Sequence, residues 1–90
     1  MEILTVPVVS SGHLSISTRR ELDRVQQDCP WTVVAVYREG WFMYAGEEHD
    51  DCDDTPPDLR AALAWARQAG HEWIRFDGAG PYVNALTRYE

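Results

Sequence analysis

Apolar residues fall into short β-branched and aromatic runs that predict four strands. Residues 31–37 and 41–45 lie on either side of a short glycine-containing loop, which predicts a β-hairpin. Residues 72–76 alternate apolar and polar side chains, as a half-buried strand does. Residues 3–9 predict a further strand, and Pro7, which cannot donate a ladder hydrogen bond, places it at a sheet edge or a bulge.

Apolar residues with helical spacing follow the first predicted strand. Thr18 and Glu21 have the spacing of a capping box, and Pro30 stops the helix. The apolar positions after the cap fall on one helical face, at Leu22, Val25 and Cys29. This pattern predicts a helix over residues 18–28.

A second helix is predicted over residues 57–69. Thr55 is a residue of the capping type, prolines are tolerated in a first turn, and Gly70 is a typical C-terminal stop. The apolar stripe of this helix consists of Leu59, Ala62, Leu63 and Ala66. Residues 77–81 contain two glycines and a proline, so a turn is expected after the last strand.

The resulting order, β-α-β-β-α-β, predicts an α+β fold on the ferredoxin-like plan, with an antiparallel sheet and two helices on one face. Ninety residues suit one compact domain spanning residues 1–90. Both faces of the predicted hairpin are apolar. One face builds the core. The other must be covered by the tail, by a second copy in a homodimer or by a partner, because large exposed apolar patches are rare on monomers.

Composition changes this picture because the chain is strongly acidic. It carries 15 acidic residues against 8 basic ones, all of them arginine, for a net charge of −7. Nucleic-acid binding is driven by Lys and Arg contacts to phosphates, so no direct nucleic-acid binding is expected. An anionic membrane is a poor ligand for the same reason. No run approaches the roughly 20 apolar residues of a membrane span, and no signal peptide is recognisable, which favours a cytoplasmic protein.

The acids concentrate in one segment. Seven of the twelve residues from Glu47 to Asp58 are acidic, and no arginine lies between Arg38 and Arg60. The segment is either a solvated connector or a surface that meets a positively charged partner. Fully extended, it carries about one charge per 6 Å, whereas a DNA strand carries about one per 3.4 Å. Mimicry of nucleic acid would therefore need further acids, such as Glu39, Glu72 or Asp77.

Two short motifs carry reactive residue types without the context that catalysis or metal binding requires. His49 and Cys52 have zinc-ligand spacing but lack a second ligand pair, and the acidic segment does not fit an EF-hand. Ser11 and His13 are sequence neighbours, which rarely achieve the geometry of a nucleophile and its base. His13 is expected to shape a turn. We expect no metal, no cofactor and no enzymatic activity.

Four tryptophans are numerous for ninety residues. Most are expected in the core, and any that is exposed beside acids would anchor a protein interface, where aromatic side chains are enriched. Trp41 and Tyr44 of the predicted hairpin are the candidate anchors. The acids that would supply the electrostatic field are Glu47, Glu48, Asp50, Asp51, Asp53 and Asp54.

Three segments carry a resemblance to a known family: Val9–Leu14, Glu72–Pro81 and Leu86–Glu90. Over nearly its full length the chain resembles a family of small acidic proteins of unknown function encoded on bacterial phages and other mobile elements. This family offers no established catalytic residue. Its setting implies a role in the contest between mobile elements and hosts, similar to that of anti-CRISPR inhibitors that occlude a DNA-binding surface.

Charge and resemblance together predict a non-enzymatic, anti-CRISPR-like inhibitor. It would mimic nucleic-acid charge and occlude the positively charged DNA- or RNA-binding surface of a host defence complex, with a CRISPR effector as the leading partner. The alternative is a cytoplasmic accessory domain that dimerises, or binds a small ligand, through its sheet face. Acids clustered with exposed rings on one face favour the inhibitor, whereas scattered acids and a sheet-to-sheet interface favour the accessory domain.

Overall fold

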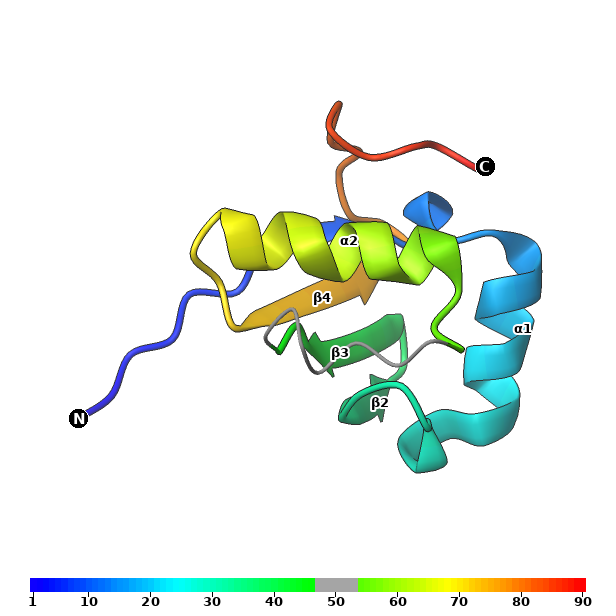
Figure 1. Ribbon diagram of the computed structural model, residues 1–90, viewed down its shortest axis with the longest axis horizontal. Helices are drawn as coiled ribbons and strands as arrows, with labels where there is room; N and C mark the ends of the chain where they lie inside the picture. The colour runs from blue at the N-terminus through cyan, green and yellow to red at the C-terminus, as the bar shows by residue number, and fades with distance from the viewer. Residues whose placement is uncertain (47–53) are drawn as a thin grey trace.

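A computed structural model describes residues 1–46 and 54–90 of the chain. Two layers result: α2 lies across one face of the sheet, and α1 lies at one end of it (Figure 1). The α+β class is confirmed, and strands and helices follow one another along the chain as predicted. The elements are β1 (Val8–Ser10), η1 (Ser11–His13), α1 (Ile16–Val25), η2 (Gln26–Asp28), β2 (Val34–Tyr37), β3 (Gly40–Tyr44), α2 (Pro57–Gln68) and β4 (Trp73–Asp77), where η denotes a 3₁₀ turn.

The sheet is mixed, which corrects the expectation of an antiparallel sheet. Its strand order is β1-β4-β3-β2. The β2–β3 and β3–β4 pairs are antiparallel, whereas β1 pairs with β4 in parallel, with Val9 opposite Phe76. β1 therefore lies at an edge, as Pro7 predicts, and the ferredoxin-like plan is not confirmed. Apolar periodicity tells which residues face the core, but it carries no information on the direction of pairing.

β1 is shorter than predicted and begins later, because apolar side chains before it remain largely exposed. Ile3 and Leu4 are 79% and 51% exposed, so their side chains gain little burial that could stabilise a strand there. Pairing begins where the main-chain oxygen of Pro7 accepts a hydrogen bond from the Arg75 amide at 3.0 Å. The prediction of a strand starting at residue 3 is wrong.

The β2–β3 hairpin confirms the strongest local pattern of the sequence. Tyr37 pairs with Gly40 at the turn, and Val36 pairs with Trp41. Gly40 is required by the neighbouring strand, because a Cβ at this position would lie 1.9 Å from the main-chain oxygen of Phe76. A glycine here lets β3 and β4 approach closely.

α1 begins at Ile16, two residues before the predicted start, because Ser15 caps it. The Oγ of Ser15 accepts a hydrogen bond from the Thr18 amide at 3.4 Å. Glu21 pairs with Arg24 one turn later. Thr18 is therefore inside the helix, and its predicted role as the cap is wrong.

Both helices end at residues with a left-handed backbone. Gln26, which follows the last residue of α1, has a φ of 50°. The chain then continues as a 3₁₀ turn to residue 28, just before Pro30. Gly70 has a φ of 89° and its amide donates to the Arg67 oxygen at 2.9 Å. Gly70 is thus the C-terminal stop of α2 that the sequence predicts.

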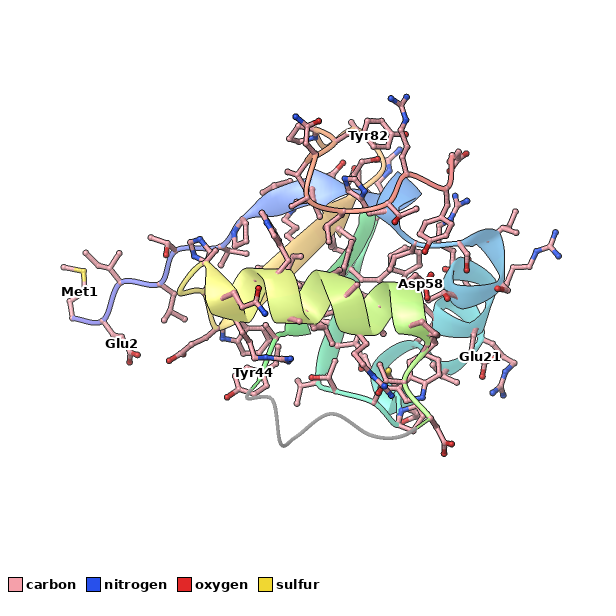
Figure 2. All side chains as sticks on the ribbon, turned by 45° about the horizontal axis from the view of Figure 1, so that its top comes forward. Met1, Glu2, Glu21, Tyr44, Asp58 and Tyr82 are labelled. Carbon is pink, nitrogen blue, oxygen red and sulfur yellow. The ribbon has the colours of Figure 1, made fainter. Side chains whose placement is uncertain are left out.

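One buried carboxylate joins the two helices where they begin. Asp58, in the first turn of α2, accepts hydrogen bonds from the Ser15 amide at 2.7 Å and from the Thr18 Oγ1 at 2.9 Å (Figure 2). Thr55 does not cap α2, contrary to the prediction. Pro56 occupies the cap position, and the Oγ1 of Thr55 is buried with no hydrogen-bond partner among the described residues.

The core lies between the helices and one face of the sheet. Alternate strand residues point into it and are buried: Val9, Val34, Trp41, Met43, Ile74 and Phe76. The helices contribute Leu22 and the predicted stripe of Leu59, Ala62, Leu63 and Ala66. The inward face of α2 is therefore confirmed.

His13 fastens the residues after β4 to the start of the chain. Its ring is buried, and its Nε2 lies 2.9 Å from the Val83 amide while its Nδ1 lies 2.8 Å from the Thr87 oxygen. Because an amide can only donate, Nε2 is the acceptor and the proton lies on Nδ1. The edge of the ring packs on Tyr82, with 5.3 Å between centroids. The sequence predicts that His13 shapes the strand-to-helix turn; it lies in η1 between β1 and α1, but the contacts of its ring are to residues after β4.

Candidate functional site

The sheet face opposite the core, which we call the outer face, is rich in aromatic side chains. α2 covers the other face (Figure 1). Core positions such as Met43 and Ile74 are completely buried, whereas every side chain of the outer face keeps some exposure. The outer face consists of the residues that alternate with the core positions: Val8, Ala35, Tyr37, Phe42, Tyr44, Trp73 and Arg75.

Phe42, Tyr44 and Trp73 form an aromatic cluster on this face. The centroid of the Trp73 ring lies 5.3 Å from that of Phe42 and 5.2 Å from that of Tyr44. The register explains the contacts, because Tyr44 is directly opposite Trp73 and Phe42 is its diagonal neighbour. Each ring is only partly buried. The cluster therefore presents aromatic surface to solvent, of the kind enriched at protein interfaces.

A polar group of Tyr37, Arg75 and Asp77 adjoins the aromatic cluster. The Nε of Arg75 donates to the Tyr37 hydroxyl at 2.8 Å, and its Nη2 donates to Asp77 Oδ2 at 3.1 Å. The Tyr37 hydroxyl lies 3.0 Å from both Asp77 Oδ2 and the Phe76 oxygen. The guanidinium carbon lies 4.7 Å from the centroid of the Tyr37 ring. Arg75 is thus held by partners within the chain.

The contacts of this polar group set its ionisation. The Ala79 amide, which donates to Asp77 Oδ1 at 2.8 Å, holds the pKa of Asp77 below its usual range. Burial raises the pKa of Tyr37, and the hydrogen bond to Tyr37 raises the pKa of Arg75. At neutral pH the group therefore contains one carboxylate, one neutral phenol and one guanidinium, and its net charge is zero.

Aliphatic side chains extend the apolar surface around the rings. Val8 is 37% exposed, and Val33, just before β2, is 63% exposed. Ala35 of β2 is also exposed. Because β1 and β2 are the two edge strands, these side chains lie at opposite edges of the sheet. The outer face therefore combines an aromatic centre, aliphatic side chains at both edges and one internally neutralised ion pair.

Of the two predicted anchors, only Tyr44 lies on the outer face. Trp41 is 7% exposed and belongs to the core. Side chains alternate between the two faces along a strand, and Trp41 is three positions before Tyr44. The two side chains therefore point to opposite faces of the sheet. The expectation that Trp41 is an exposed anchor is therefore wrong.

Trp73 and Arg75 are the site residues that the sequence does not reveal. Alternation along β4 does place them on one face, so a signal for their shared orientation exists. Tyr37, the partner of Arg75, comes from β2, a strand that is not adjacent to β4. That proximity depends on the strand order, which no local pattern predicts.

Most of the predicted acidic site lies outside the described residues. Asp54 is exposed. Gly46, the last described residue before the acidic segment, is two residues after Tyr44 in the sequence. Glu39 and Glu72 are also exposed, whereas Asp77 is 8% exposed and bound within the polar group. The acids that fall in residues 47–53 are Glu47, Glu48, Asp50, Asp51 and Asp53.

Residues 1–46 and 54–90 bring together no group of three or more His, Cys, Asp or Glu side chains that could hold a metal ion. His49 and Cys52 lie outside these ranges. Cys29 is a free thiol that is partly buried against the core. Neither of the described α-helices is long and apolar enough to cross a membrane.

A family model matches residues 6–90, and its description is the C-terminal domain of a family of unknown function, DUF5983. The chain belongs to this family. No curated protein and no solved structure gives a significant match. The family description names no activity, so a function follows only from the site itself.

Proposed function

We propose that this member of the DUF5983 family is a non-enzymatic, anti-CRISPR-like inhibitor that occludes a positively charged, nucleic-acid-binding surface of a host defence complex. The observation that carries the proposal is the partly exposed aromatic cluster of Phe42, Tyr44 and Trp73, on the sheet face opposite the core. Tyr44 and Trp73 are the proposed anchors. A CRISPR effector is the leading partner.

The charge of the chain supports a basic protein partner. A net charge of −7 attracts basic surfaces and speeds association with them. The acidic segment starts at Glu47, three residues after Tyr44 in the sequence. Acids and rings would therefore meet the same partner, the acids setting the rate of association and the buried rings the lifetime of the complex.

The outer face is a poorer match to nucleic acid. Sheets with exposed aromatic side chains also bind RNA, where basic residues accompany the rings. On this face Arg75 is already bound by Tyr37 and Asp77, so its charge is compensated. A protein partner is the better fit to rings without free cations.

Competition for DNA tests this proposal. A purified CRISPR effector is bound to fluorescent target DNA and titrated with the protein, and release of the DNA is measured. We expect displacement that weakens as ionic strength approaches about 0.15 M, where the field reaches only about 8 Å. Neutralising Asp50, Asp51, Asp53 and Asp54 to Asn should weaken it too. No displacement from effectors of several types, or displacement that ignores both salt and the substitutions, would contradict the proposal.

The second candidate is an accessory domain that forms a homodimer, or binds a small ligand, through the outer face. The exposed side chains of Val8, Val33 and Ala35 favour it, because aliphatic side chains at both edges of the face suit a flat sheet-to-sheet contact. Sedimentation equilibrium separates the two. A dimer that dissociates on Trp73→Ser supports the accessory domain, whereas a monomer at concentrations that displace DNA supports the inhibitor.

A further inference from the structure

A groove lies between α1 and the β2–β3 hairpin, and none of the rings of the aromatic cluster lines it. Its volume is about 340 Å³. Its apolar lining comes from Ile16 of α1 and from Val36 and Trp41 of the hairpin. Ile16 is 58% exposed, and Val36 is 37% exposed although it pairs with the buried Trp41. The groove therefore displays apolar surface that the core does not use.

Three arginines line the same groove: Arg19 and Arg20 from α1 and Arg38 from the hairpin turn. The chain has only 8 basic residues in all, and like charges repel one another at close range. Three of them converge on this groove against two carboxylates, Asp23 and Glu39, so three positive and two negative charges leave the lining with one net positive charge. Guanidinium groups match the geometry of carboxylate and phosphate, which makes such a cluster typical of an oxyanion site.

Arg19 shows which chemistry this cluster attracts. Its Nη1 donates to the carboxylate of Glu90, so one oxyanion already lies against the arginines. Its Nε is buried and has no hydrogen-bond partner among the described residues. A buried donor of a charged group is costly to leave without an acceptor. An acceptor in the groove would remove that cost.

Arg20 and Arg38 keep their charges available. Both side chains are exposed, and neither forms an ion pair within the described chain. Arg24, on the same helix, differs because it is paired with Glu21 and does not line the groove. The unpaired arginines of α1 and of the hairpin turn thus face one common space.

We propose that this groove binds a small organic anion, with its carboxylate or phosphate on the arginines and its apolar body on Ile16, Val36 and Trp41. The volume is at the lower end of the roughly 300–1,000 Å³ of small-molecule sites. Asp23 and Glu39 also line the groove. Their charges repel a polyanion such as a nucleic-acid strand, so the site selects a compact ligand with a single anionic group. Of the outer-face residues, only Tyr37 also lines the groove, and none of the three aromatic-cluster rings does.

Titration followed by NMR tests the site with two probes, phenyl phosphate and benzoate. We expect saturable shifts of the Val36 and Arg38 amides and of the Trp41 indole N–H for at least one probe, and the tighter probe identifies the preferred head group. Inorganic phosphate should bind about tenfold more weakly than phenyl phosphate, because it leaves the apolar surface uncovered. Absence of saturable shifts with both organic probes would overturn the proposal.

Single substitutions show whether the arginines act as a site or as diffuse charge. Arg20→Gln and Arg38→Gln should each weaken binding of the tighter probe about tenfold, the effect of one lost charge-assisted hydrogen bond. Both side chains are exposed, so both variants are expected to fold, and either one alone decides the question. Arg24→Gln is the matched control and should change affinity less than about twofold. Equal weakening by Arg24→Gln would overturn the proposal.

Glu90→Gln should raise the affinity for the probe, whereas the arginine substitutions should lower it. It removes the carboxylate that competes for Arg19, so it should strengthen probe binding by up to about fivefold, the scale of one exposed ion pair. Unchanged or weaker binding would contradict the assignment of Arg19 to the site.

Discussion

At the scale of single residues, Asp58 is the polar side chain on which the arrangement of the helices depends. It is 8% exposed and accepts two hydrogen bonds from the first turns of α1, across 43 and 40 positions of sequence. A carboxylate near the start of a helix is also stabilised by the positive end of the helix dipole. Asp58 therefore caps α1 from a distance while it belongs to α2.

Asp58→Ala should lower the free energy of unfolding by about 2 to 4 kcal/mol, because the Ser15 amide and the Thr18 hydroxyl lose a charged acceptor. Chemical denaturation measures the change. Asp54→Ala is the control, since Asp54 is exposed, and it should alter stability by less than about 0.5 kcal/mol. Equal stability of the two variants would show that the Asp58 contacts contribute little.

Asp77 should make stability depend on pH in the acid range. Its pKa is lowered in the folded protein, chiefly by the Ala79 amide. Its contribution to stability is therefore complete above the unfolded value of about 3.9 and is lost as pH falls through the lower folded pKa. Carboxyl NMR should detect titration of Asp77 below the usual aspartate value of about 3.9, and titration at or above that value would contradict the assignment.

Tyr37→Phe tests the order of these causes. It removes one hydrogen bond to the Asp77 carboxylate but leaves the Ala79 amide in place. The pKa of Asp77 should therefore rise only partly toward its usual value. A complete return would mean that the phenol, and not the amide, holds the carboxylate ionised.

At the scale of elements, the close packing of the hairpin against β4 depends on Gly40. Gly40→Ala places a Cβ 1.9 Å from the Phe76 oxygen, so β3 and β4 must separate. We expect a loss on the order of 2 kcal/mol or more in denaturation experiments. Gly78→Ala is the matched control, because its Cβ would lie 3.7 Å from the main-chain oxygen of Glu39, an ordinary van der Waals contact. Similar losses in both variants would point to backbone entropy instead.

The elements also show what a sequence can predict. The hairpin and the apolar stripe of α2 depend on residues that are close together in the sequence, and the predictions made from those local patterns are confirmed. The cap of α1 at Ser15 is held by Asp58, and β1 pairs in parallel with β4; both of these partners lie far along the chain. The same holds for the site: alternation separates Trp41 from Tyr44, whereas the approach of Tyr37 to Arg75 requires the strand order.

At the scale of the whole molecule, the two faces of the sheet carry different chemistry. One face packs against α2 and holds the core, the outer face holds the aromatic cluster, and the arginine-lined groove lies between α1 and the hairpin (Figure 1). An acidic chain that displays rings on the outer face suits a basic protein surface. The central claim is therefore that Tyr44 and Trp73 anchor a partner.

The most direct test is the affinity of three variants for a CRISPR effector that the wild-type protein binds. Tyr44→Ala and Trp73→Ser should each weaken binding about thirtyfold or more, as loss of an interface anchor does. Tyr89→Ala is the control, because its side chain is 48% exposed and does not belong to a strand of the outer face, and it should change affinity less than about twofold. Melting curves establish that all three variants fold. Affinities within about twofold of one another in all three would contradict the claim.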